Sequence, residues 1–172
     1  MAKKAKNKPN LAHAAQPNAV GIVRLARAPL RARALAAAAA TPATDPNVPV
    51  AAISATGGPV TVSITFGQAQ HAKYTIQLFD PSGNNELARL SGINTDQVPD
   101  EFTLQGAPSQ LDQHMLQWSG LVSAFSPAPG QQFSVTFDVS QNGAPVQGGR
   151  VVRTGALSGA QAFIGVLRLV TR

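Results

Sequence analysis

Apolar and polar side chains alternate along several short stretches in the second half of the chain. Residues 60–66 read Val-Thr-Val-Ser-Ile-Thr-Phe, so their apolar side chains share one face and their hydroxyl side chains the other. Residues 133–139 repeat this alternation, and Tyr74, Ile76 and Leu78 continue it elsewhere. A period of two is typical of a half-buried β-strand. The pair Asn142-Gly143 follows the strongest of these stretches and predicts a hairpin with a type I′ turn, which requires positive φ at both central residues.

The spacing of these stretches predicts an all-β domain over residues 60–172. About seven to nine short strands are expected, because turn signals recur roughly every 8–12 residues. This spacing favours an antiparallel β-sandwich of immunoglobulin-like or jelly-roll-like type, with a small barrel as the alternative. No helix-length periodic segment separates the strands, so a parallel βαβ architecture is not expected. The chain has no cysteine, which excludes disulfides and thiolate metal sites.

The last apolar stretch, residues 162–170, is apolar on both faces. Ile164 and Val166 share one face, and Phe163, Leu167 and Leu169 share the opposite one. Such a strand is expected either at the centre of a sheet or at an edge that another subunit covers. Two interpretations therefore stay open: residues 162–170 form a central strand of one monomer, or they pair with a second copy to form a homo-oligomer.

Charge is distributed unevenly along the chain. The first 44 residues hold eight Lys or Arg and no acid, which is +8, whereas the rest holds six Lys or Arg and eight Asp or Glu, which is −2. We therefore interpret residues 1–44 as a basic, Ala/Pro-rich, largely disordered N-terminal arm. A short helix is expected at residues 30–40 if the arm is docked on a partner, and residues 45–59 are expected to form a linker.

Uncompensated positive charge on a tether favours an anionic partner, either a polymer or a surface, and nucleic acid (RNA or DNA) is the preferred candidate. The arm lacks aromatic side chains for stacking on bases, so contact with phosphates is expected rather than base reading. The candidate nucleic-acid-binding or anion-binding residues are the cations of the arm: Lys3, Lys4, Lys6, Lys8, Arg24, Arg27, Arg31 and Arg33.

The predicted layout, a cationic arm on a β-sandwich, is similar to the plan of small icosahedral coat proteins, in which the arm meets the genome. The similarity is one of plan alone and assigns no residue. It implies a non-enzymatic binding or assembly protein whose body self-associates or presents loops. The alternative is an exported β-sandwich module that binds a carbohydrate or a protein, with the first 43 residues as a leader. The leader would use Arg31 and Arg33 before the apolar residues 34–40, a poor match to a signal peptide.

Catalytic and metal chemistry find little support in the sequence. The nucleophile-elbow and phosphate-loop motifs are absent. His71 and His114 have no carboxylate or histidine at a ligand spacing, so we expect no catalytic residue, metal site or cofactor. The acidic stretch 94–101 is a weak calcium candidate without the spacing of a calcium loop. Trp118 is expected in the core, with a sugar-stacking platform as the alternative. No apolar run reaches the roughly 20 residues of a membrane-spanning helix.

Overall fold

The computed structural model describes residues 21–24, 47–67, 70–126 and 128–172, and within 21–24 it describes the backbone alone. Across these residues the fold is all-β, as the alternation predicts, and the only helical element is a short 3₁₀ turn. The elements are β1 (Gly21–Arg24), β2 (Val50–Ile53), β3 (Val60–Phe66), β4 (Gln70–Phe79), β5 (Glu86–Asn94), β6 (Asp100–Gln105), η1 (Pro108–Leu111), β7 (Met115–Ala124), β8 (Gln132–Gln141), β9 (Ala144–Ala156) and β10 (Gln161–Thr171).

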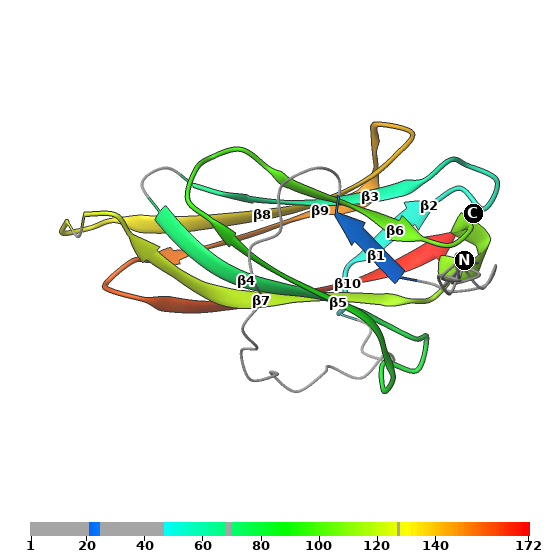
Figure 1. Cartoon of the computed structure of the whole chain (residues 1–172), viewed down its shortest axis with the longest axis horizontal. Helices are drawn as coiled ribbons and strands as arrows, with labels where there is room; N and C mark the ends of the chain where they lie inside the picture. The colour runs from blue at the N-terminus through cyan, green and yellow to red at the C-terminus, as the bar shows by residue number, and fades with distance from the viewer. Residues whose placement is uncertain (1–20, 25–46, 68–69, 127) are drawn as a thin grey trace, which may run out of the picture.

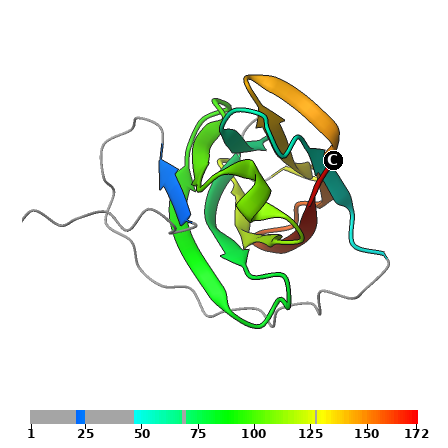
Figure 2. The same ribbon diagram turned by 90° about the vertical axis from the view of Figure 1, so that its right-hand side faces the viewer.

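The strands form one continuous sheet in the order β1-β6-β3-β8-β9-β2-β10-β7-β4-β5. Its two halves face one another across a common core (Figure 1). The terminal strands β1 and β5 come close to each other, so the sheet is nearly closed (Figure 2). The all-β class is thus confirmed, whereas the two separate sheets of a sandwich are not shown, because the strands form one nearly closed sheet. The expectation of antiparallel pairing throughout is wrong, because β2 runs parallel to β10 and the sheet is therefore mixed.

Strand alternation explains which side chains fill the core. Every second residue of β3 and of β8 is buried, in the register that the sequence predicts. The predicted hairpin after β8 is confirmed, since Asn142 has φ 53° and Gly143 has φ 75°. These are the left-handed conformations that a type I′ turn demands.

Trp118 lies at the centre of this core, as the sequence interpretation expected. The indole is 0% exposed and stacks on Phe137 from the facing half of the sheet, with ring centroids 4.0 Å apart and planes tilted by 3°. Phe66 links the halves in the same way through Tyr74 on β4 and Phe163 on β10. Such offset aromatic contacts bury large apolar areas and fix the spacing of the layers.

Residues 50–53, inside the stretch expected to be a linker, form β2 and are part of the fold. Ala51 and Ile53 are buried, and β2 pairs with the last residues of β10. The residues after β2 are also held: the Gln141 side chain accepts a hydrogen bond from Ser54 N (2.8 Å) and donates to the Ser54 and Gly58 carbonyls (3.0 Å each). The folded body therefore begins before residue 60.

The core contact of Trp118 depends on a missing side chain at Gly165. A Cβ atom at this position would overlap the indole ring of Trp118, so we expect Gly165→Ala to lower the free energy of unfolding by about 1–3 kcal/mol. The measurement is urea unfolding followed by tryptophan fluorescence. Ala162→Val, at an exposed position of the same strand, is the control and should change stability by less than about 0.5 kcal/mol. Equal effects of the two substitutions would contradict the packing argument.

Candidate functional site

Most of the predicted arm cations lie outside the residues that the structure describes. Seven of the eight candidates lie outside the described residues: Lys3, Lys4, Lys6, Lys8, Arg27, Arg31 and Arg33. The expected helix at residues 30–40 also lies outside them. Arg24 is the exception, because its backbone ends β1 and pairs with Phe102 of β6. The side-chain geometry of the arm site therefore stays a prediction.

Strand β1 divides the predicted arm into two parts. Gly21–Arg24 pairs antiparallel with residues 102–105 of β6, so the chain is fastened to the sheet in the middle of the segment expected to be free. Four lysines precede β1, and three arginines follow it before residue 34.

The acidic stretch 94–101, the weak calcium candidate, uses its polar atoms to shape its own loop. Asn94 Oδ1 accepts a hydrogen bond from Asp96 N (3.2 Å), and Asp96 Oδ1 accepts one from Val98 N (3.0 Å). These are Asx-type turns, which need no cation. Within the described ranges, no group of three or more His, Cys, Asp or Glu side chains is arranged to hold a metal ion.

Asp100 is the buried member of this stretch, at 4% exposure. Its Oδ2 atom accepts hydrogen bonds from the Tyr74 hydroxyl (2.6 Å) and from Asn94 Nδ2 (3.2 Å). Tyr74 and Asn94 come from β4 and the end of β5, and Asp100 begins β6, so this cluster joins the two halves of the sheet where β5 passes to β6. Sequence reasoning missed it because Tyr74 and Asp100 are 26 residues apart and only the fold makes them neighbours.

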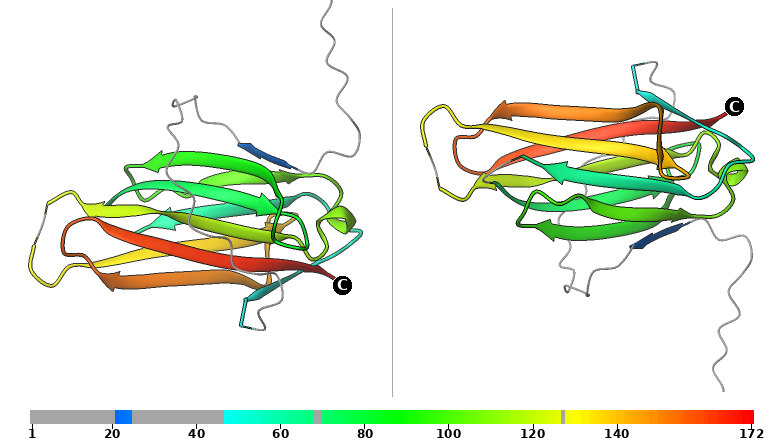
Figure 3. Two further views of the ribbon diagram at one scale, coloured as in Figure 1. Left: turned by 90° about the horizontal axis from the view of Figure 1, so that it is seen from below. Right: turned by 90° about the horizontal axis from the view of Figure 1, so that it is seen from above.

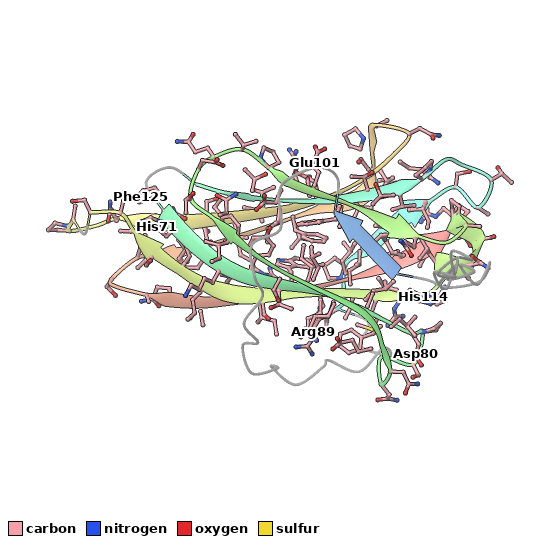
Figure 4. The ribbon with its side chains drawn as sticks, viewed as in Figure 1. His71, Asp80, Arg89, Glu101, His114 and Phe125 are labelled. Carbon is pink, nitrogen blue, oxygen red and sulfur yellow. The ribbon has the colours of Figure 1, made fainter. Side chains whose placement is uncertain are left out.

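The two histidines of the body lie at different ends of the molecule (Figure 4). His71 is exposed and its ring lies edge-on to Phe125, with centroids 3.8 Å apart. His114 is 8% exposed, and its Nδ1 atom lies 3.0 Å from the carbonyl oxygen of Asp112. Neither imidazole hydrogen-bonds a serine hydroxyl in the described part of the chain, so the geometry that a Ser–His nucleophile requires does not form there.

Most carboxylates of the body act as local acceptors. The Ser82 hydroxyl and the Asn85 side-chain amide donate to Asp80 (2.7 and 2.6 Å) and lower the pKa of Asp80 to about 2. A hydrogen bond from Thr171 N (2.8 Å) lowers the pKa of Asp112 and ties η1 to the end of β10. Glu86 and Asp138 form ion pairs with Arg89 and Arg150. These contacts give the four carboxylates structural roles.

The position of Trp118 bears on the alternative of a carbohydrate-binding module. A sugar-stacking platform needs an exposed ring, and Trp118 is fully buried. Phe125 is the exposed aromatic side chain among the described residues, and it is partnered by His71. The stacking site considered from the sequence therefore does not form at Trp118.

The last strand is paired on both sides, but unequally. β10 pairs with β7 over residues 161–168 and with β2 only over residues 168–171. β10 is therefore an internal strand of the sheet, as expected if residues 162–170 form a central strand of one monomer. On the β2 side, its residues 161–167 are not paired with a described strand. Ile164, in this stretch, is an exposed large apolar residue.

Comparisons with known proteins name no relative, since no family model, curated protein or solved structure matches this chain. Across the described residues there is also no helix of the length and apolar character that crossing a bilayer requires. Function must therefore be argued from the residues themselves.

The Tyr74–Asp100 hydrogen bond should contribute to the stability of the fold. We expect Tyr74→Phe to lower the free energy of unfolding by about 1–3 kcal/mol, because a buried carboxylate loses one of its donors. Urea unfolding at neutral pH measures this change. Thr136→Val, on the outward face of β8, serves as the control with an effect under about 0.5 kcal/mol. A Tyr74→Phe protein as stable as the control would show that the bond contributes nothing.

The Asp80 turn predicts a pH-dependent effect. A carboxyl group whose pKa is lowered on folding stabilises the folded state while it is ionised. For Asp80 this stabilisation is present above its ordinary pKa of 3.8 and is lost as the pH falls through about 2. We expect Asp80→Asn to lower the melting temperature at pH 7 and to lower it much less near pH 2, measured by circular dichroism. An equal deficit at both pH values would be inconsistent with this origin.

Proposed function

We propose that this chain is a non-enzymatic binding and assembly protein whose N-terminal arm contacts nucleic acid through the phosphate backbone. The observation that carries the proposal is the concentration of eight cations in residues 1–44 without one acid. Lysine and arginine that neutralise phosphates release counterions, which supplies affinity without sequence recognition. Contacts with the phosphates of RNA or DNA fit this composition better than recognition of bases by stacking, because the arm has no aromatic residue.

The charges of the body support this assignment by contrast. Arg89 and Arg150 are engaged with Glu86 and Asp138, so two of its cations are already compensated. Its acids shape turns and strand ends, as Asp80, Asp96 and Asp112 do. A polyanion would therefore meet its strongest attraction at the arm.

Strand β1 favours an arm that is retained over a leader that is removed. Cleavage near residue 43, as the exported alternative requires, would remove β1 and leave the edge of β6 unpaired. An exposed strand edge is a site of aggregation that folded proteins normally cover. This argument favours the coat-protein-like plan, with an assembling body and a polyanion-binding arm, over the exported ligand-binding module.

Neutralising the lysines before β1 tests the proposal without removing any of the fold. We expect the quadruple variant Lys3→Gln/Lys4→Gln/Lys6→Gln/Lys8→Gln to bind a mixed-sequence DNA duplex more weakly than the full chain. The slope of log affinity against log salt should change from about −7 for eight phosphate contacts to about −3.6 for four. Fluorescence anisotropy between about 0.05 and 0.5 M salt covers this range, and at the upper limit the Debye length is only about 4 Å.

The control is Lys73→Gln/Arg172→Gln, which removes two exposed cations of the body and should leave the slope nearly unchanged. Equal binding by the quadruple variant and the full chain would refute a role of these lysines. The N-terminal residue of the protein isolated from its source decides the alternative, since a start near Thr44 would indicate a leader.

A further inference from the structure

Arg168 of β10 carries two buried hydrogen-bond donors that have no acceptor among the described residues. These donors are the Nε and Nη2 atoms of its guanidinium. Leaving a buried donor unsatisfied costs free energy, and more so for a charged group, so folded proteins rarely contain one. An acceptor from outside the described part of the chain is therefore expected at this edge of the guanidinium.

The edge formed by Nε and Nη2 is the one with which arginine holds an oxyanion in this protein. Arg150 donates from Nε (2.6 Å) and Nη2 (3.2 Å) to the two carboxylate oxygens of Asp138. Arg89 uses the same two atoms to bind Glu86. This planar fork matches a carboxylate or a phosphate, because two parallel N–H groups meet two oxygens of one ligand. Arg168 presents the same pair of donors, with neither engaged by a described residue.

The backbone of Arg168 is held on both sides, so the start of its side chain is well defined. Arg168 pairs with Met115 of β7, and its N–H group donates to Pro49 O (2.8 Å). Its neighbours Leu167 and Leu169 face the core, so alternation directs Arg168 to the outer face of β10. The left view of Figure 3 shows this outer face from below.

Apolar side chains lie around this position on the outer face. Met115 is 3% exposed and packs with Val48 and Phe79, and Val166 lies against the same cluster. A hydrogen bond to a charged group is stronger in such surroundings than in water. Arg168 as a whole is only half-buried, so solvent reaches part of its side chain. A change of rotamer carries the donor edge to that accessible side without moving the backbone.

Three carboxylates belong to the strand ends around Arg168, and each has another partner. Asp80 accepts hydrogen bonds within its own turn, and Asp112 accepts one from a backbone N–H near the end of β10. Glu86 is paired with Arg89. Within the described ranges, no carboxylate forms an ion pair with Arg168, so its fork is available to an anion that the protein binds.

We propose that Arg168 binds a phosphate group through its Nε–Nη2 edge, either inorganic phosphate or a phosphodiester of nucleic acid. Two oxygens of the phosphate accept the two N–H groups, as the carboxylate of Asp138 does for Arg150. The phosphodiester source rests on the proposed function and gives the body one anchor for the polymer. The site for inorganic phosphate does not depend on the arm.

Inorganic phosphate is the first probe, titrated into the full-length protein at constant ionic strength. The Nε–H resonance of Arg168, followed by nitrogen–proton NMR, should shift and saturate at phosphate concentrations on the order of 1–10 mM, which is the range of a weak single-site ligand. Phosphate should also raise the melting temperature of the full chain more than that of Arg168→Gln, because a ligand of the folded state stabilises it.

The matched control is Arg150→Gln, since the fork of Arg150 already holds Asp138. This variant should keep the whole phosphate-dependent shift in melting temperature. The general stabilisation of folded proteins by phosphate is common to all three proteins and cancels in the comparison.

The mixed-sequence DNA duplex is the second probe and separates the two sources of phosphate. Loss of one phosphate contact in Arg168→Gln should make the slope of log affinity against log salt less steep by about 0.9. An unchanged slope, with the phosphate response intact, would assign the site to inorganic phosphate and remove nucleic acid as its ligand. Equal DNA binding by the quadruple lysine variant would refute the proposed function and leave the phosphate site in place.

Two results would overturn the proposal. The first is an Arg168 resonance that does not respond to phosphate, or an Arg168→Gln protein that keeps the whole melting shift, since an ordered water would then be the acceptor. The second is a shift of the Arg168 resonance caused by Asp45→Asn in the absence of phosphate. That shift would identify a carboxylate of this chain as the partner of the fork.

Discussion

The stacking of Trp118 on Phe137 is the contact on which the rest of the molecule depends. The two rings come from β7 and β8, on facing halves of the sheet, so their separation sets the thickness of the core. Gly165 of β10 leaves space for the indole, and Gly120 of β7 lets the neighbouring strand and Phe163 approach closely. With the halves held at this distance, the sheet is nearly closed. Strand pairing is incomplete at two places only among the described strands, between β1 and β5 and between β9 and β10. Close packing of this kind leaves little freedom to adjust one contact alone.

Those two edges differ in what covers them. At one edge β1 lies beside β5, and the Tyr74–Asp100 hydrogen bond joins the halves where β5 passes to β6. At the other, β2 joins β9 to β10 for only part of their length, and the Arg153 side chain crosses the remainder. An inward-directed charge on an open strand edge is a known device against unspecific pairing.

The charged side chains fall into two groups: those that form structural contacts in the body, and the cations of the N-terminal arm. In the body, carboxylates accept hydrogen bonds that fix turns and strand ends, and two arginines are ion-paired. Exposed ion pairs of this kind contribute little to stability, but they lower the net field of the body. The first 44 residues, by contrast, hold eight cations and no acid.

The sequence alone determined the features that depend on local order. The alternation in residues 60–66 and 133–139 predicted strands with the correct buried face, the pair Asn142-Gly143 predicted its turn, and the burial of Trp118 followed from its place in an apolar strand. Each of these rests on interactions within a few residues, which a pattern records directly. The charge asymmetry is likewise a property of the sequence, and the contacts of the arm stay a prediction.

Only the tertiary structure decided how distant segments pair. Residues 50–53 have too little alternation to signal a strand, and they become one because they pair with β10, while the side chain of Gln141 holds Ser54 directly after them. The parallel pairing of β2, the attachment of β1 to β6, the near-closure of the sheet and the Tyr74–Asp100 bond all join residues far apart in the chain. Such contacts depend on packing across the core, which no local pattern encodes.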